Sequence, residues 1–349
     1  MRIAVVGAGA VGSRIVEFLV GSDDVESVVV IGHPSGRRQR DSYFPFDGDR
    51  TSQRFAPARK VRFADVAEAA ELGVEATVVT APELLEYFVH LSLAESVHVV
   101  TPVDEPDLLR RTMAMDTRAR QSGCSVALGT AMAPGLSCVL ARYLCGDGGS
   151  NYLGGFDVVE ELHVASAGTG GPTCARRHHS ALAAISVDWQ EGSWRRRPGG
   201  SGRELVWFPG PVGGADCYRA HLADPMLLAP AFPSARRITA RIEATRRDRL
   251  TSPLPMLRKP HPEGLTGAVR VEMRGFVGRE AVTRIVGSAG RPAVIAAAVC
   301  TVAARWAAQG RLARTGVGGL AEMVNDPAGF ARDLADYGVT ISGFVGGDV

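Results

Sequence analysis

The chain opens with the stretch MRIAVVGAGAVGSRIVEFLV, residues 1–20, which carries the pattern GxGxxG at residues 7–12. A continuous apolar run precedes the glycines, as is typical of a strand covered on both faces. The residues that follow have the spacing of a helix from about Val11 to Val20. The pattern GxGxxG alone is weak evidence for a nucleotide site, but between a strand and a helix it predicts a dinucleotide-binding βα unit.

Each residue of this turn has an expected role. Gly7 permits the tight turn, Gly9 lets the backbone approach a pyrophosphate, and Gly12 allows the helix to pack closely on the strand. Ala10 and Val11 open the helix, whose free N–H groups and dipole favour a negatively charged group. The alternative interpretation is a plain glycine-rich turn in an unrelated α/β protein.

The end of the second expected strand, VVVI, decides between the two nicotinamide dinucleotides. NAD enzymes usually carry Asp or Glu there, bonded to the ribose 2′-hydroxyl. Here GHPSGRR follows the strand, and the next carboxylate is Asp41. Because arginine suits bidentate phosphate contacts, we expect a 2′-phosphate to be held by His33, Ser35, Arg37 and Arg38. NADP(H) is therefore the predicted cofactor, unless these side chains are solvated loop charges.

Strands and helices alternate through the first part of the chain. Further strands are expected at 61–64, 77–80, 97–101 and 125–128, with helices at 83–95 and 104–123. This rhythm predicts a parallel, doubly wound Rossmann sheet. Ligands bind outside the carboxyl ends of such strands, so the nicotinamide side is expected to be lined by Thr80, Ala81, Pro82 and Thr101. A proline after a strand is also common simply as a stop.

After about Gly148 the pattern becomes one of alternating strands. They are expected at 157–164, 187–195, 237–243, 267–274 and 280–287, with helices at 174–185 and 292–309. An α+β second domain with an antiparallel sheet follows from this alternation. The predicted division is a nucleotide domain over 1–133, a substrate and dimerisation domain over 134–315, and a segment over 316–349 that returns to the first domain.

Composition excludes several classes of protein. A length of 349 residues suits two domains, and a net charge of +2 gives no argument for a nucleic-acid or membrane partner. No apolar run reaches the roughly 18 residues that span a bilayer, and no signal peptide is seen. The six cysteines form no CxxC pair, which favours a reduced, cytoplasmic setting. No His, Cys or Asp cluster shows metal-ligand spacing, so no metal is expected.

Several segments together resemble the saccharopine dehydrogenase-like family, which includes saccharopine reductases and lysine 6-dehydrogenases. Besides residues 7–12, these segments are MDTRARQSG at 115–123, GTAMAPGLS at 129–137, GTGGP at 168–172, WQEGSW at 189–194, Phe208-Pro209, Gly316, Glu322 and Asp326-Pro327. The segment 33–60 departs from the family. Ala133-Pro134-Gly135 replaces the Asp-Pro-Gly of saccharopine reductases and is closer to the lysine 6-dehydrogenase-like branch.

The resemblance implies hydride transfer at a carbon–nitrogen centre. An amino-acid-like amine or imine would lie in the cleft between the two domains. The expected function is an NADP(H)-dependent oxidoreductase. A carbonyl or enoyl reductase on the same scaffold and a non-catalytic NADP-binding sensor are the alternatives. A homodimer, formed through the second sheet or the Ala-rich helix, is also expected.

Two aspartates are candidates for catalysis. Asp104 stands just after an expected strand, where it would act as a base or orient a substrate amine. It would equally serve as the N-cap of the following helix, with acidic residues in the first turn. Asp116 occupies a position that the resemblance implies for substrate contact, and its alternative is a solvated helix face.

The run Arg176-Arg177-His178-His179 follows the second glycine-rich loop. Histidine supplies acid–base chemistry near neutrality, and arginine clamps carboxylates. Adjacent helical residues point about 100° apart, so only one residue of each pair should face the cleft. His178 is the catalytic candidate, although a basic helix face is the alternative. The expected substrate-binding residues are Pro134, Gly135, Gly171, Arg176 and His179.

Overall fold

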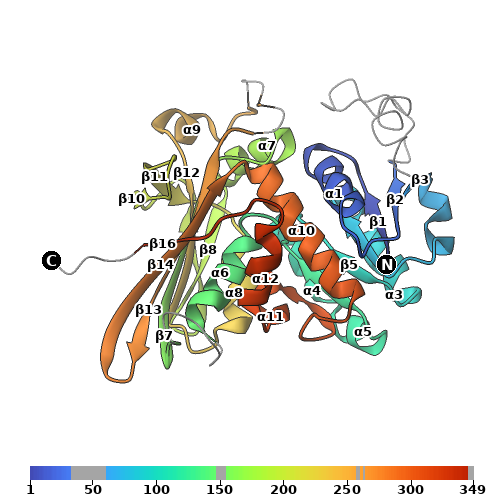
Figure 1. Ribbon diagram of the computed structural model, residues 1–349. Helices are drawn as coiled ribbons and strands as arrows, with labels where there is room; N and C mark the ends of the chain where they lie inside the picture. The colour runs from blue at the N-terminus through green and yellow to red at the C-terminus, as the bar shows by residue number, and fades with distance from the viewer. Residues whose placement is uncertain (33–59, 147–154, 257–259, 262–263, 345–349) are drawn as a thin grey trace.

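The computed structural model describes residues 1–32, 60–146, 155–256, 260–261 and 264–344. The predicted 2′-phosphate ligands His33, Ser35, Arg37 and Arg38 lie outside the described residues. Two sheets stand at opposite ends of the molecule, with helices α6, α8, α10, α11 and α12 between them (Figure 1).

The first sheet is a seven-stranded parallel sheet, which confirms the Rossmann-type prediction. Its order is β15-β6-β5-β4-β1-β2-β3. The strand bounds are β1 Arg2–Val6, β2 Ser27–Ile31, β3 Val61–Ala64, β4 Ala76–Val79, β5 His98–Val100, β6 Ser125–Leu128 and β15 Gly316–Gly319. Six of them lie at the predicted positions. Most carry the apolar runs that a strand covered on both faces requires, whereas β3 at the edge is largely exposed.

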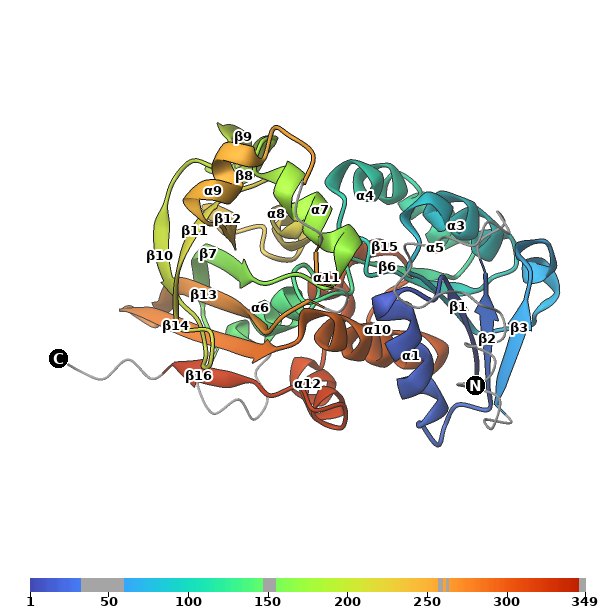
Figure 2. The same ribbon diagram turned by 90° about the horizontal axis from the view of Figure 1, so that it is seen from above.

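Helices cover both faces of this sheet (Figure 2). On one face lie α1, Ala10–Val20, and α10, Pro292–Ala308, which contact each other. On the other lie α3, Leu85–Ala94, α4, Pro106–Met113, and α5, Asp116–Gln121. The Ala-rich α10 is buried along most of its length and packs on β4 and β5. Short 3-10 turns, η1 Val66–Glu71 and η2 Pro82–Leu84, precede β4 and α3.

The single helix expected over 104–123 is wrong, because the chain breaks it at Ala114 and Met115. The N–H of Ala114 is shared between the carbonyls of Arg110 and Arg111, as at a helix end. The break lets α5 start afresh at Asp116, whose side chain binds the backbone of β15.

The second sheet is mixed, with nine strands, and confirms an α+β second unit. Its path is β10-β11-β12-β7-β13-β14-β16, and β8 pairs with both β12 and β9. Within this sheet, only the β7–β12 pair of the described strands runs parallel. The bounds are β7 Val158–Ala167, β8 Ile185–Gln190, β9 Ser193–Pro198, β10 Glu204–Trp207, β11 Gly214–Arg219, β12 Arg237–Glu243, β13 Gly267–Val277, β14 Glu280–Gly290 and β16 Ser342–Phe344.

The strand expected over 187–195 is instead a hairpin of β8 and β9. Its turn is formed by Glu191 and Gly192, both with positive φ, 47° and 72°. Aromatic residues flank the turn on both strands and give the segment a uniform strand-like composition. The strand-like residues on both sides of Glu191 and Gly192 therefore hide the hairpin turn in the sequence.

The tail reaches both sheets. The strand β15 pairs with β6 at the edge of the first sheet, and β16 pairs with β14 of the second. Between them lie α11, Leu320–Met323, and α12, Pro327–Ala335. One hydrophobic core runs from Ile3 of the first sheet to Met273 of the second without interruption. The helices between the two sheets therefore belong to a single core that contacts both sheets.

Four further helices and one 3-10 turn complete the framework. They are α6 Leu136–Cys145, α7 Pro172–Ala181, α8 Asp224–Leu228, α9 Arg246–Thr251 and η3 Ala229–Ala231. Among the helices of the described residues, none is both long and apolar enough to cross a membrane.

Candidate functional site

The glycine turn after β1 has the tight geometry that its sequence predicts. Gly7 has φ +88°, and its N–H donates to the carbonyl of Ile31 at 3.0 Å. A Cβ on Gly12 would lie 2.1 Å from the backbone oxygen of Gly7. Any side chain at residue 12 would therefore push α1 away from the turn.

The N-terminus of α1 is open and fits a pyrophosphate. Gly9 is exposed, has φ −71°, and no atom lies within 4 Å of an ideal Cβ on it. No side chain caps α1, and its first turn, which begins with Ala10 and Val11, holds no acidic residue. Within the part of the chain that the structure describes, the first N–H groups of the helix are thus free for an anion, which the helix dipole also favours.

Two threonines brace the carboxyl edge of the sheet. The hydroxyl of Thr80 donates to the carbonyls of Val6 and Gly7, at 2.9 and 3.0 Å. Thr101 is fully buried, and its hydroxyl donates to the carbonyl of Val79 at 2.8 Å. We therefore correct the expected cofactor contact of Thr101 to a structural one, because its side chain does not reach the surface. Ala81 and Pro82 stay half-buried at the start of η2.

Asp104 follows β5 and pairs with Arg177 of α7. The two terminal guanidinium nitrogens of Arg177 contact the two carboxylate oxygens of Asp104. This bidentate ion pair joins the loop after β5 of the first sheet to α7. The side chains are only 12% and 24% exposed. Burial lowers the pKa of Arg177 to about 10, which leaves it charged at neutral pH. Asp104 does not cap α4, whose N-cap residue is Glu105.

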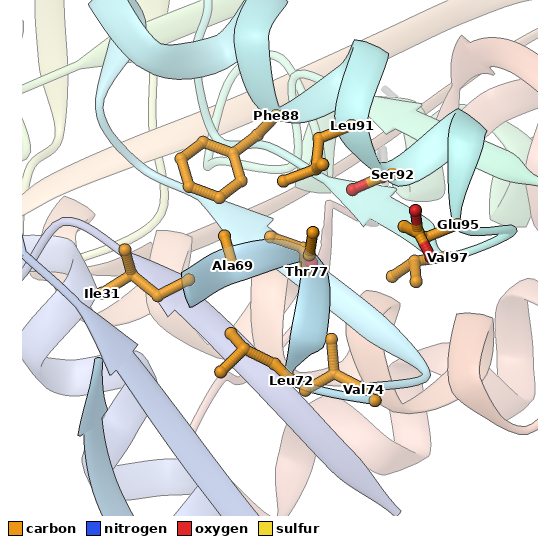
Figure 3. A pocket seen from close by; sticks show the side chains of 12 residues that line it. Ile31, Ala69, Leu72, Val74, Thr77, Phe88, Leu91, Ser92, Glu95 and Val97 are labelled. Carbon is orange, nitrogen blue, oxygen red and sulfur yellow. The ribbon is translucent and has the colours of Figure 1, made fainter. Parts of the chain in front are cut away.

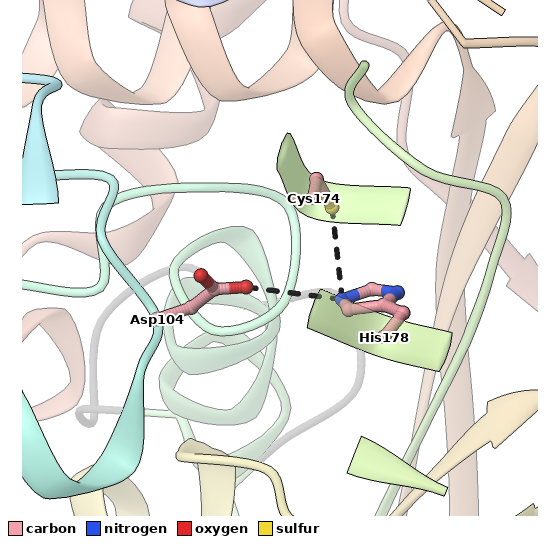
Figure 4. A group of neighbouring side chains, drawn as sticks. All are labelled: Asp104, Cys174 and His178. Atoms are coloured by element: carbon pink, nitrogen blue, oxygen red, sulfur yellow. Dashed lines mark hydrogen bonds and ion pairs between the residues drawn. The ribbon is translucent and has the colours of Figure 1, made fainter. Parts of the chain in front are cut away.

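Two further polar groups of α7 meet Asp104 (Figure 4). The Sγ of Cys174 lies 3.7 Å from Nε2 of His178, and the same nitrogen lies 3.8 Å from Oδ2 of Asp104. Burial raises the pKa of the Cys174 thiol, but His178 and a backbone hydrogen bond from Gly170 lower it by more. The thiol therefore ionises more readily than an ordinary buried cysteine.

Only one residue of each adjacent pair on α7 faces this cluster, as the helical repeat predicts. Arg177 faces it, while Arg176 is exposed. His178 faces it, while Nε2 of His179 lies 3.0 Å from the carbonyl of Thr251, next to α9. Arg176 and His179 therefore lie outside this cluster, and their substrate contacts stay predictions. The side facing Asp104 carries residues 174, 177 and 178, which are three and four residues apart.

Pro134, Gly135 and Gly171 shape the backbone at the starts of α6 and α7. Gly135 has φ +131°, and a Cβ on it would lie 2.2 Å from the carbonyl oxygen of Ala131. Pro134 is buried, and its carbonyl accepts from the N–H of Ala131 at 2.9 Å. Gly171 has φ +126° and is the N-cap of α7. These residues position α6 and α7, and their burial leaves them little surface for a substrate.

Asp116 lies apart from the other predicted catalytic residues. It accepts from the N–H of Val317 at 2.8 Å and from the side chains of Arg120 and Arg314, at 2.7 and 3.3 Å. Val317 follows the first residue of β15, so Asp116 lies near the amino edge of the parallel sheet, whereas Asp104 follows the carboxyl end of β5. In Figure 1, α5 and α7 accordingly lie at opposite ends of the view. Asp116 therefore holds β15 of the C-terminal tail against α5, in place of the catalytic role expected for it.

Replacing Asp116 by alanine should therefore cost stability and leave cofactor affinity unchanged. Losing hydrogen bonds from a half-buried carboxylate is expected to lower the free energy of unfolding by about 2 kcal/mol. Denaturant titration measures this, with Asp107→Ala as control, since its exposed pair with Arg110 should contribute under about 1 kcal/mol. Lost turnover at unchanged stability would return Asp116 to the catalytic set.

Sequence reasoning missed a buried carboxyl group at the start of α8. Asp224 is 1% exposed and accepts from the hydroxyl of Ser137 at 2.7 Å. Burial raises its pKa to about 6, against the opposing effects of Ser137 and the charge of His178. It thus lies within electrostatic reach of the cluster. Asp224-Pro225 looks like an ordinary helix start, and no local pattern indicates that its carboxyl group is buried.

A separate pocket lies over one face of the first sheet (Figure 3). Side chains of η1, β4 and α3 line it, among them Thr77, Phe88 and Leu91. None of its lining residues belongs to the glycine turn or to the Asp104 cluster. This pocket is therefore distinct from the candidate site.

Comparison with known proteins bears on the fold. No protein-family model matches the chain, and no curated protein sequence matches it. Among solved structures, apo saccharopine dehydrogenase (L-Glu forming) from Saccharomyces cerevisiae matches with a TM-score of 0.63 at 14% identity, over 99% of this chain and 100% of that one. DAP dehydrogenase from C. glutamicum matches with a TM-score of 0.48 at 13% identity, over 94% and 95%. At these identities the likeness concerns the fold, and the chain has the two-domain fold of saccharopine dehydrogenase, as its sequence motifs predict.

Proposed function

We propose that this protein is an NADP(H)-dependent oxidoreductase that transfers hydride at the carbon–nitrogen centre of an amino-acid-like amine or imine. The observation that carries the proposal is the uncapped N-terminus of α1 beyond the Gly7–Gly12 turn. It opens at the carboxyl edge of the sheet, where Asp104 follows β5, and dinucleotides bind at this edge in such sheets. The likeness to saccharopine dehydrogenase supports the reaction class.

The nicotinamide would supply the hydride chemistry. The residues of the chain would hold and orient the reactants. The first turn of α1 would bind the pyrophosphate, and Gly9 leaves room for its approach. The preference for NADP(H) is supported by the missing carboxylate after β2 and by Arg37 and Arg38.

The Asp104–Arg177 pair would orient the substrate. It offers one negative and one positive group in a largely buried setting. These charges complement the ammonium and carboxylate groups of an amino acid. The cluster of Asp104, Cys174 and His178 would handle the proton of the reacting nitrogen, since its three polar atoms converge beside the same loop.

The first test is cofactor binding, followed by turnover. We expect NADPH to bind more tightly than NADH by about 10-fold or more, because one charged hydrogen bond is worth roughly 1.5–3 kcal/mol. Nicotinamide fluorescence on titration of the full chain measures both affinities. Absence of binding by either dinucleotide would sink the proposal.

Turnover separates the alternatives. Amines and imines of amino acids should change the absorbance of the nicotinamide, and aldehydes should not. Turnover with aldehydes or enoyl compounds alone would favour the reductase alternative. Tight NADPH binding without turnover of any substrate would favour a sensor.

A homodimer and a cytoplasmic location belong to the same proposal. Leu205 and Trp207 on β10 are 60% and 64% exposed, on the side opposite the buried Val206. Exposed apolar groups of this size on the face of a sheet support a contact with a second copy.

A further inference from the structure

We propose that Asp104, Cys174 and His178 form a binding site for Zn²⁺ with one coordination position left open. The three residues offer one carboxylate oxygen, one sulfur and one imidazole nitrogen, all within 4.8 Å of one another. These are the ligand types that zinc takes in proteins, and three protein ligands with an open fourth position are typical of catalytic zinc. The inference goes beyond the proposed function and does not depend on it.

Two of the three separations are close to those between ligands of a tetrahedral metal. Zinc bonds of about 2.0–2.3 Å place neighbouring ligand atoms roughly 3.4–3.6 Å apart in a tetrahedron. The observed separations are 3.7 Å between Cys174 Sγ and His178 Nε2 and 3.8 Å between His178 Nε2 and Asp104 Oδ2. The second is too long for a hydrogen bond between nitrogen and oxygen. Shifts of a few tenths of an ångström would bring these two separations to the tetrahedral values.

The contacts of Cys174 and Asp104 converge on a single ring nitrogen of His178, as they would around one shared metal. In a relay of the catalytic-triad type, the nucleophile and the carboxylate contact different nitrogens of the histidine. Here Cys174 and Asp104 both face Nε2 of His178 (Figure 4). One N–H cannot point at both acceptors. A cation between the three atoms would satisfy all of them at once.

The surroundings hold the ligands in place. Cys174 and His178 lie four residues apart on α7 and thus on one face of it. The backbone of Gly170 hydrogen-bonds to the sulfur of Cys174. Arg177 holds the carboxylate of Asp104, which has lone pairs enough both to accept from Arg177 and to bind a metal. Such outer contacts orient metal ligands in known sites.

Two of the proposed ligands, the Asp104 carboxylate and the Cys174 thiolate, are negatively charged when they bind a metal. Arg177 pairs with Asp104 and leaves the thiolate without a cationic partner in this pair. A divalent cation would compensate that second charge. The sequence shows only the C-x3-H spacing, because Asp104 lies 70 residues away from Cys174.

The test uses the full chain, stripped with a chelator, and Co²⁺ as a spectroscopic substitute for Zn²⁺. We expect one Co²⁺ per chain, with a thiolate-to-cobalt charge-transfer band and the visible bands of tetrahedral cobalt, both lost when Zn²⁺ is added. Cys174→Ser should abolish the charge-transfer band. His178→Gln and Asp104→Asn should weaken zinc binding by more than the roughly 10–100-fold that loss of an outer contact costs.

Matched controls are Cys145→Ser and His90→Gln, which change the same residue types away from the cluster. Both should bind zinc like the unchanged chain. Circular dichroism verifies that each variant is folded, and NADPH titration without metal tests the proposed function separately. The inference is overturned if the stripped chain binds no stoichiometric zinc, or if the charge-transfer band persists in folded Cys174→Ser.

Discussion

Replacing Gly12 by alanine is expected to weaken dinucleotide binding by about 100-fold and to destabilise the fold. The added Cβ would lie 2.1 Å from the backbone oxygen of Gly7 and 3.2 Å from the hydroxyl of Thr80. The backbone oxygen of Gly7 cannot yield without moving α1 or the turn. Such overpacking costs about 3 kcal/mol. Losing two charged hydrogen bonds from the displaced helix end, each roughly 1.5 kcal/mol, corresponds to about 100-fold in affinity.

Two other glycines of the same βα unit separate packing from binding. Gly9→Ala has open space and an ordinary φ of −71°, so it should fold normally and still bind the dinucleotide more weakly. Gly21→Ala, just beyond α1, meets nothing closer than 3.5 Å and should bind like the unchanged chain. Thermal unfolding and NADPH titration measure the three variants together. Equal affinities for all three would contradict a pyrophosphate site at α1.

Replacing Asp224 by asparagine should stabilise the protein above neutrality and have far less effect in acid. Burial raises the pKa of Asp224 to about 6 from an ordinary value of 3.8. Between these values the folded state holds a proton that the unfolded state has lost. Stability from this group is therefore present below the ordinary pKa and is lost as the pH rises through about 6.

Asparagine carries no charge and can still accept a hydrogen bond from Ser137. In Asp224→Asn, the loss of stability with rising pH should therefore disappear. The free energy of unfolding of Asp224→Asn relative to the unchanged chain is expected to rise by about 2 kcal/mol between about pH 4 and about pH 8. Denaturant titration across this range measures it. Ser137→Ala is the matched variant, since it removes a contact that favours the charged form and should destabilise more at about pH 8 than in acid. Parallel pH curves for all three proteins would refute the buried titration.

The strands of the first sheet were predictable for a local reason. A strand covered on both faces needs a largely apolar run. The strands β1, β2 and β4 lie where the sequence has such runs. The strand β15, with the sequence GVGG, gives no such pattern. Glycine is needed there because a Cβ on Gly319 would lie 2.8 Å from the Cβ of Leu227 in α8. Long-range packing, rather than local preference, makes this segment a strand.

The candidate site divides in the same way. The GxGxxG turn could be read from the sequence, because all its contacts lie within a short stretch between one strand and one helix. The spacing of α7 likewise predicted that one residue of each adjacent pair faces the cleft. The spacing does not show which residue of each pair faces Asp104, nor that Cys174 lies beside His178. Both depend on the orientation of α7 against the loop after β5.

By itself, then, the sequence determined the parallel sheet, the glycine turn at the start of α1 and the order of the two units. These follow from apolar period and glycine spacing, which act over a few residues. The tertiary structure alone assigned Asp116 to the tail, buried Asp224, and brought Asp104 to Cys174 and His178. These pairings join residues up to about 200 positions apart, and no local pattern encodes which distant side chains the packing of helices will place together.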